Sequence, residues 1–329
     1  MFNILQIQNF KSIKDLKLDC KRVNIFIGKP NTGKTNILEA LGLMGLNQSP
    51  NGLSDLKIFA RHETINNLFY DENIEQHITI KFGDYLFSLS YDKQNFSGYI
   101  GSGATVIQPF FEFKADYEHI TSSTNSQKKT NIKYYRYNEK TKYNLKEADY
   151  LLPVVGDNLV FLLTINKKLR SLTADLFKEF GLRVVLEPQI NQIKIQKEID
   201  DIIITYPYIL VSDTLRRLIF HLAAIETNKD SVIVLDEPEA FAFPYYVKYI
   251  AERIGLDDSN QYFVATHNPY FLSSIIEKTQ KEDLAIFVSY FDDYQTKIRT
   301  IKDNEISGIF EMSQNKDIFL NLEKYINKL

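Results

Sequence analysis

Apolar and polar side chains alternate along the first part of the chain, as in strands that bury one face. This pattern predicts two short strands ahead of an apolar run at 23–27. Alternation returns at 78–82 and 86–91, and Gly83-Asp84 between the two runs predicts a β-hairpin. The alternating apolar positions of the first two strands are Ile4, Leu5, Ile7, Phe10, Ile13, Leu16 and Leu18.

Three later segments are apolar throughout rather than alternating. They span 231–235, 261–266 and 284–288, and like the run at 23–27 they consist mostly of consecutive apolar residues. Such strands are buried on both faces, which is typical of a parallel sheet in an α/β protein. We therefore predict an α/β fold, in which ligands bind at the carboxyl ends of the strands.

Helical spacing of apolar residues appears after the run at 23–27 and in two further segments. It predicts helices from residue 36, over 156–180 and over 214–225, with Gly181 and Ser212 as candidate caps. A hairpin is expected over 184–195, and a short strand with a closing helix in the last thirty or so residues. Heptad repeats are not sustained anywhere in the sequence, which excludes a long coiled coil.

Composition places the chain among globular proteins. Its 329 residues are 44% hydrophobic and 25% charged, with a net charge of −3, so a nucleic-acid contact would need a local basic patch. The single cysteine, Cys20, fits a reducing compartment and is interpreted as a buried apolar residue. The sequence has neither a signal-peptide pattern nor an apolar run of about 20 residues, so we expect a soluble cytoplasmic protein.

The segment after the run at 23–27 fits the phosphate-loop pattern G-x-x-x-x-G-K-[ST] between a strand and a helix. Backbone N–H groups of such a loop, together with the helix N-terminus, bind an anion. Lys34 would contact the β- and γ-phosphates, and the Thr35 hydroxyl would ligate Mg²⁺. The sequence therefore predicts that the chain binds a nucleoside triphosphate. The predicted contact residues are Gly28, Lys29, Pro30, Asn31, Thr32, Gly33, Lys34, Thr35 and Asn36.

Polar side chains follow two of the apolar runs. Asp236 and Glu237 end the run at 231–235, where Asp236 can hold Mg²⁺ and Glu237 can take a proton from an attacking water. His267 ends the run at 261–266 and can donate to the γ-phosphate or to that water. The alternative interpretations are a solvated turn for the two carboxylates and a structural histidine.

These motifs together resemble the ABC-type ATPases, in the branch that includes RecF, the SMC heads and the OLD-family ATPases. The resemblance rests on 9–15, the phosphate loop, 235–239 and 266–268, and it covers about 1–95 and 205–290. It implies an ABC-type core built from 1–98 and 205–329, with an N-terminal β-subdomain. Residues 99–204 would form an inserted α+β lobe.

The same resemblance implies a homodimer that holds ATP and Mg²⁺ between one subunit's phosphate loop and its partner's signature motif. The signature falls at 211–216, so that Ser212 would contact the partner's nucleotide, but the glycine of the family pattern Ser-Asp-Gly-Thr-Leu-Arg is missing. Phe241-Ala242-Phe243-Pro244 stands where relatives commonly carry histidines, which favours an apolar dimer or packing surface.

Two other features of relatives have only weak counterparts. Gln76 and Gln94 are the candidates for the glutamine of the Q-loop. Asp292-Asp293 is a lone acidic pair, and 62 residues follow His267, so we expect no nuclease domain of the OLD type.

Bases and aromatic residues interleave at 133–137 and 140–143, a pattern that can bind DNA through phosphate contacts and stacking. The alternative, which we favour here, is a solvated strand edge in a lysine-rich sequence. The basic residues are Lys128, Lys129, Lys133, Arg136, Lys140 and Lys142.

These motifs are consistent with two alternative functions. In the first, ATP hydrolysis drives dimer closure and opening that acts on DNA or on a partner effector, in DNA maintenance or antiphage defence. In the second, ATP is a structural or sensing ligand of a non-hydrolysing scaffold. The missing signature glycine favours the second. The first is favoured by the intact set of Lys34, Thr35, Asp236, Glu237 and His267, because a pure scaffold needs neither a base nor a sensor.

Overall fold

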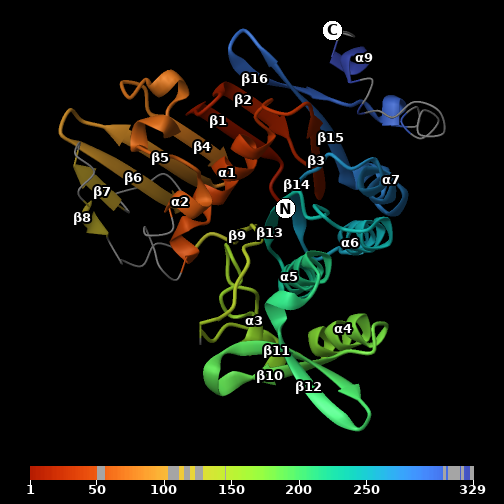
Figure 1. Ribbon diagram of the computed structural model, residues 1–329. Helices are drawn as coiled ribbons and strands as arrows, with labels where there is room; N and C mark the ends of the chain where they lie inside the picture. Colours follow the sequence, from red (N-terminus) through yellow and green to blue (C-terminus); the bar gives the residue numbers. More distant parts are fainter. Residues whose placement is uncertain are drawn as a thin grey trace.

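A computed structural model describes residues 1–49, 56–102, 111–114, 119–122, 129–144, 146–306, 309, 319 and 322–326. Two sheets flank one helix, α1 (Lys34–Met44), and a smaller sheet lies at the far end of the molecule (Figure 1). The short 3₁₀ helices are η1 (Leu46–Gln48), η3 (Ile65–Leu68), η4 (Tyr70–Glu72), η5 (Pro188–Ile190), η6 (Tyr208–Leu210) and η7 (Lys281–Asp283).

The central sheet has six strands in the order β16-β15-β3-β14-β13-β9. Every neighbouring pair is parallel except β15 and β16, which form an antiparallel hairpin. The predicted parallel arrangement of the continuous apolar strands is therefore confirmed. The strands are β3 (Val23–Gly28), β9 (Ile132–Tyr135), β13 (Val232–Asp236), β14 (Gln261–Ala265), β15 (Leu284–Asp292) and β16 (Gln295–Thr300).

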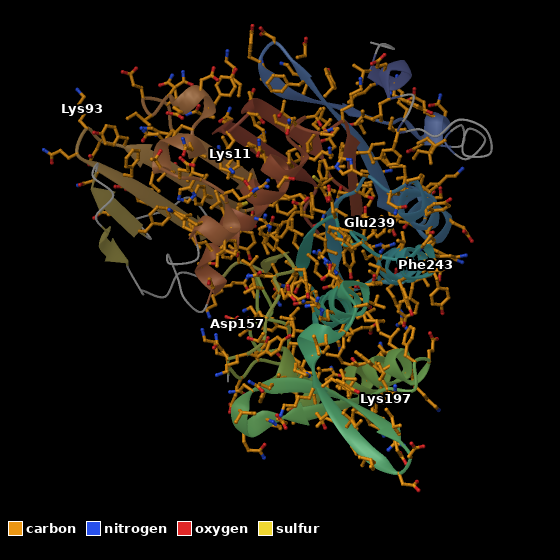
Figure 2. All side chains as sticks on the ribbon, viewed as in Figure 1. Lys11, Lys93, Asp157, Lys197, Glu239 and Phe243 are labelled. Atoms are coloured by element: carbon orange, nitrogen blue, oxygen red, sulfur yellow. The ribbon has the colours of Figure 1, made fainter. Side chains whose placement is uncertain are left out.

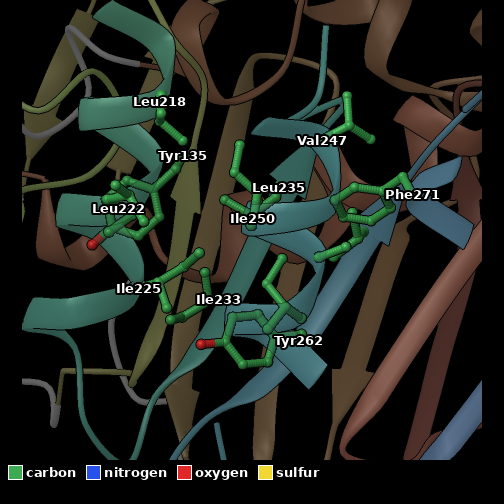
Figure 3. Close-up of a cluster of buried hydrophobic side chains, with 14 of the residues drawn as sticks. Tyr135, Leu218, Leu222, Ile225, Ile233, Leu235, Val247, Ile250, Tyr262 and Phe271 are labelled. Atoms are coloured by element: carbon green, nitrogen blue, oxygen red, sulfur yellow. The ribbon is translucent and has the colours of Figure 1, made fainter. Parts of the chain in front are cut away.

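Helices cover both faces of this sheet, which explains its apolar texture. On one face lie α5 (Asp213–Thr227), α6 (Pro244–Leu256) and α7 (Pro269–Lys278), and their apolar sides meet Ile233 and Leu235 of β13 (Figure 3). The other face packs against α1 in a second core that also includes the N-terminal sheet. Both cores bury strand and helix residues almost completely, so they hold the strand ends in fixed positions.

The N-terminal sheet is antiparallel, with seven strands in the order β2-β1-β4-β5-β6-β7-β8. Its β4–β5 pair is the predicted hairpin, because Phe82 lies opposite Tyr85 across the Gly83-Asp84 turn. Short helix α2 (Leu56–Phe59) lies beside α1. The strands are β1 (Ile4–Phe10), β2 (Ile13–Asp19), β4 (Ile78–Phe82), β5 (Tyr85–Tyr91), β6 (Asn95–Ser102), β7 (Phe111–Lys114) and β8 (His119–Ser122).

A third unit holds a three-stranded antiparallel sheet below α5 in Figure 1. Its hairpin of β10 and β11 was predicted, whereas the predicted helix over 156–180 is two helices separated by Asn166. The Asn166 side chain accepts a hydrogen bond from the Leu169 N–H and so starts a new helix. The elements of this third unit are α3 (Leu159–Ile165), α4 (Lys167–Lys178), β10 (Arg183–Glu187), β11 (Gln192–Ile199) and β12 (Ile202–Pro207). A separate short helix, α9 (Glu323–Ile326), lies near the end of the chain.

The predicted boundaries of the inserted lobe differ from the structure. Strands β6 to β8 extend the N-terminal sheet, and β9 is an edge strand of the central sheet, although 99–204 includes most of them. Of the described residues in 99–204, those from 136 onward belong to no strand of either large sheet. Strand β9 was not predicted from the sequence because it has only four residues and includes a lysine. No coiled coil occurs in the described ranges, in agreement with the missing heptads.

Candidate nucleotide-binding site

The phosphate loop joins the carboxyl end of β3 to the first turn of α1, as predicted. Gly33 has a φ of 88°, and a Cβ built there would lie 2.0 Å from the Thr296 hydroxyl oxygen and 2.9 Å from that of Ser12. A Cβ on Gly28 would lie 2.4 Å from the backbone oxygen of Ser289. The loop therefore needs both glycines, because β15 and the β16 hairpin press against it.

Polar side chains brace the loop from within. The Thr32 hydroxyl donates to the Lys29 carbonyl over 2.8 Å and contacts the Ser289 hydroxyl at 2.6 Å. Asn36 donates to the Ser12 hydroxyl over 2.7 Å, and Lys29 forms an exposed ion pair with Glu323. In this conformation Asn36 and Lys29 hold neighbouring elements, so their predicted contact with nucleotide stays a prediction.

Lys34 is the cation inside the loop. Its Nζ donates to the Gly28 and Lys29 carbonyls over 2.9 and 2.8 Å, and the residue is 5% exposed. Burial lowers the pKa of Lys34 to about 8, against the attraction of Glu237 and Asp236. A buried ammonium held only by carbonyl oxygens would gain from a phosphate anion.

Thr35 and Asp236 are 201 residues apart in the sequence and lie side by side in the fold. The Thr35 hydroxyl donates to Asp236 Oδ1 over 3.4 Å. Burial raises the pKa of Asp236, the charge of Glu237 raises it further, and the Thr35 hydrogen bond, Arg61 and Arg136 act in the opposite direction. A hydroxyl and one carboxylate at a desolvated edge fit Mg²⁺, which takes few protein ligands and completes its shell with water and phosphate oxygens. Within the described residues no group of three or more His, Cys, Asp or Glu could hold a metal by itself.

Glu237 and His267 form a pair at the neighbouring strand ends. His267 Nε2 lies 2.9 Å from Glu237 Oε1, and the two side chains are 40% and 44% exposed. This hydrogen bond lowers the pKa of the Glu237 carboxyl, which therefore stays ionised. Glu237 also has a φ of 49°, a backbone conformation that costs energy in a non-glycine residue and that concentrates at functional sites.

A cleft of about 320 Å³ opens beside this pair. Phe241 and Tyr270 at its rim are exposed, as is Phe243 nearby (Figure 2). The Phe241 carbonyl accepts a hydrogen bond from Thr214 at the predicted signature motif. The cleft is lined by Glu237, Glu239, Ala240, Phe241, Ala242, His267, Asn268, Pro269 and Tyr270.

Ser212, the predicted contact to a partner's nucleotide, caps helix α5. Its Oγ accepts a hydrogen bond from the Leu215 N–H over 3.4 Å, and Ser212 itself is exposed. Asp213, the next residue, forms ion pairs with Arg217 and Arg216 within the same helix. The N-terminus of α5 is therefore accessible, and the role of Ser212 stays a prediction.

Glu239 is a buried acid of this cleft that sequence reasoning missed. It is 5% exposed, its Oε1 accepts a hydrogen bond from the Thr266 hydroxyl, and its Oε2 has no hydrogen-bond partner in the part of the chain that the structure describes. Burial raises the pKa of Glu239 to about 7. A second glutamate two residues after Glu237 was the available signal, but burial could not be inferred from it.

The raised pKa of Glu239 predicts a stability that depends on pH. A carboxyl whose folded pKa is raised favours folding below its unfolded pKa of about 4.5, and this contribution is lost as the pH rises through about 7. Glu239→Gln mimics the protonated acid, so wild type should lose about 3 kcal/mol more stability than this variant between pH 5 and pH 8. Urea unfolding of both proteins at these two pH values measures the difference. Parallel pH profiles would contradict the assignment.

A second missed cluster surrounds Glu39 of α1. Glu39 is fully buried; it accepts a hydrogen bond from Lys11 Nζ and another from Arg61 Nε, the latter over 2.8 Å. Lys11 also donates to the Arg61 carbonyl over 2.7 Å. Arg61 attracts Asp236 electrostatically, so this cluster places a cation near the predicted Mg²⁺ ligand. The motif at 9–15 contained Lys11, but its partners are distant in sequence.

The six basic residues proposed for DNA do not form one accessible surface. Lys133 is 4% exposed, donates to Asn228 and lies 3.4 Å from the Tyr150 ring centroid, so it cannot contact DNA. Lys140 is ion-paired with Asp157, and Arg136 lies near Asp236. Lys129 and Lys142 are exposed, and Lys128 lies outside the described residues.

The glutamine candidates for the Q-loop are both exposed and lie in the N-terminal part of the fold. Gln94 follows Lys93 in the turn between β5 and β6, at the outer end of the antiparallel sheet (Figure 2). Gln76 precedes β4. The strand end beside Asp236 is instead occupied by Arg136, which follows β9.

Comparisons with known proteins agree with this geometry. A family profile described as AAA ATPase domain matches residues 1–157. The DNA replication and repair protein RecF of Lactobacillus acidophilus (strain ATCC 700396 / NCK56 / N2 / NCFM) is 48% identical over 52 residues, which is 16% of this chain and only 14% of RecF.

Two solved SMC heads share the fold. A crystal structure of an SMC head bound to the C-terminal winged-helix domain of ScpA has a TM-score of 0.55 at 14% identity, covering 94% of this chain and 99% of the other. The Pyrococcus furiosus SMC head, with an extended coiled coil and bound to the C-terminal domain of ScpA, has a TM-score of 0.54 at 13% identity, covering 95% and 99%. None of the helices in the described ranges could cross a membrane. The motifs, the AAA ATPase profile over residues 1–157 and the shared fold together make the chain similar to the P-loop ATPases of the ABC class, among them RecF and the SMC heads.

Proposed function

We propose that this protein is an ATP-hydrolysing molecular switch that dimerises head to head around ATP. The observation that carries the proposal is the Glu237–His267 pair, 2.9 Å apart, at the same sheet edge as Lys34, Thr35 and Asp236. A protein that only stored ATP would need no ionised carboxylate beside a histidine at this edge.

Each residue of the site has a distinct role in ATP binding or hydrolysis. The loop N–H groups and Lys34 bind the phosphates, while Thr35 and Asp236 would hold Mg²⁺, which would neutralise charge on the β- and γ-phosphate oxygens. Glu237 accepts a proton from the attacking water because its carboxyl is ionised and partly exposed. His267 orients Glu237 through their hydrogen bond, and with ATP bound it can instead donate its N–H to the γ-phosphate.

The head-to-head arrangement is proposed from the fold class and from the exposed groups near the site. The N-terminus of α5 with Ser212 is open, and Phe241 and Phe243 expose apolar surface between it and the cleft. A second copy would cover these aromatic side chains and bring Ser212 to its neighbour's phosphates. The name of RecF and the ScpA-bound SMC heads support DNA or a partner protein as the target, in DNA maintenance or antiphage defence.

A scaffold that binds ATP without hydrolysing it is the second candidate. The observation in its favour is the missing signature glycine, because Thr214 directly follows Asp213 at the N-terminus of α5, where the family pattern has a glycine between them.

ATP turnover at two protein concentrations a hundredfold apart tests the proposal. We expect turnover per molecule to rise with concentration, and light scattering to show a dimer with ATP, because each site would need a neighbour's Ser212. A monomer without turnover that still binds ATP tightly would instead establish the scaffold. A monomer that hydrolyses ATP equally well at both concentrations would refute the shared site.

A further inference from the structure

Arg136 lies at the nucleotide edge of the central sheet. Strand β9 pairs in parallel with β13, and Tyr135 lies opposite Leu235 in the register. The residues that follow this pair are Arg136 and Asp236, on neighbouring strands about 5 Å apart. The Arg136 N–H donates to the Val154 carbonyl over 3.0 Å, which fixes its backbone on the other side.

Alternation along β9 indicates the side to which Arg136 projects. Tyr134 lies in the core around α1, where a Cβ on Gly42 would come within 3.0 Å of its ring. Tyr135 lies in the opposite core with α5. Arg136 therefore projects to the side of Tyr134, on which α1 and the phosphate loop lie. Tyr134 interacts electrostatically with Asp236 and Glu39 and with the two arginines Arg61 and Arg136. These interactions agree with placing Arg136 on the same side of β9 as Tyr134.

Arg136 is available for a ligand, whereas its neighbours are already paired. Lys11 and Arg61 share Glu39, and Lys34 is bound by two carbonyls. Arg136 is half-buried, and across the described residues its guanidinium has no ion pair within 4.0 Å. Asp236 attracts it without such contact. A half-buried guanidinium near a predicted Mg²⁺ ligand is suited to an anion with several oxygens.

We propose that Arg136 binds the terminal phosphate of ATP from the β9 side of the site, opposite Lys34, and so distinguishes ATP from ADP. This inference rests on the proposed function, because it requires ATP with its phosphates at the loop of 28–35. Lys34 comes from the loop and would contact the β-phosphate, which both nucleotides share, as well as the γ-phosphate. Arg136 comes from the far side of Asp236, so the γ-phosphate is the group that extends toward it. The guanidinium can donate two parallel hydrogen bonds to phosphate oxygens, and ADP lacks this group.

Equilibrium binding of β,γ-imido-ATP and of ADP, both with Mg²⁺, tests the assignment without hydrolysis. We expect Arg136→Ala to weaken binding of β,γ-imido-ATP at least tenfold and to change binding of ADP by less than twofold. Arg136→Lys keeps the charge but loses the two-pronged geometry, so its affinity should lie between those of Arg136→Ala and wild type. Lys142→Ala is the matched control, because Lys142 is an exposed base of the same segment. Thermal unfolding of each variant verifies the fold.

The outcomes separate the two proposals. Equal loss of both nucleotides in Arg136→Ala, or no loss of either, would overturn the role in γ-phosphate recognition. Loss of DNA binding with unchanged nucleotide binding would also overturn it and would assign Arg136 to a DNA surface. A wild type that binds neither nucleotide would overturn the proposed function itself, and this is measured before any variant is compared.

Discussion

Replacing Glu237 with glutamine is expected to reduce ATP turnover at least about a hundredfold while ATP stays bound. The amide cannot accept a proton from the attacking water, whereas the phosphate loop, Thr35 and Asp236 are untouched. The side chain keeps its size and can still hydrogen-bond to His267, which is 2.9 Å from the carboxylate in wild type. Steady-state phosphate release and retention of ATP on the purified variant are the two measurements.

The matched control is Glu277→Gln. Glu277 is 54% exposed on α7, the helix that follows His267, and its only ion pair among the described residues is with Lys278. The control removes one carboxylate charge from the same region and should leave turnover within about twofold of wild type. If Glu237→Gln turned over ATP at the wild-type rate, Glu237 would not be the base, and the proposed mechanism would lose its central step.

The phosphate loop and the strand ends could be predicted because their information is local. The spacing of Gly28, Gly33 and Lys34 requires one backbone shape, and continuous apolar runs indicate strands buried on both faces. Parallel strands end at one edge, so Asp236 and His267 could be placed together before any distance was known. The Thr35–Asp236 contact, across 201 residues of chain, agrees with that expectation.

Other parts of the site depend on pairings that no local pattern encodes. Strand β9 carries Lys133, whose ammonium is buried against Asn228 and Tyr150, so its sequence resembles a solvated basic segment. Without the register of β9 on β13, Arg136 could not be placed beside Asp236. Glu239 resembles a surface residue in sequence and becomes buried only when Thr266 packs against it. Burial and long-range pairing decide the chemistry of these residues.

Replacing Lys34 with alanine is expected to weaken ATP binding about a hundredfold, because a charge-assisted hydrogen bond to phosphate contributes about 1.5–3 kcal/mol. The ammonium is enclosed by the loop and donates to the Gly28 and Lys29 carbonyls, so a phosphate would find it already in position. Isothermal titration with Mg²⁺ and β,γ-imido-ATP measures the loss, and Lys17→Ala, an exposed lysine on β2, is the control. Because Lys34 would also contact the β-phosphate, which ATP and ADP share, ADP binding should fall as well, unlike in Arg136→Ala. Equal affinity in Lys34→Ala and wild type would mean that nucleotide binds outside this loop, and the assignment of Glu237 as the base would fail with it.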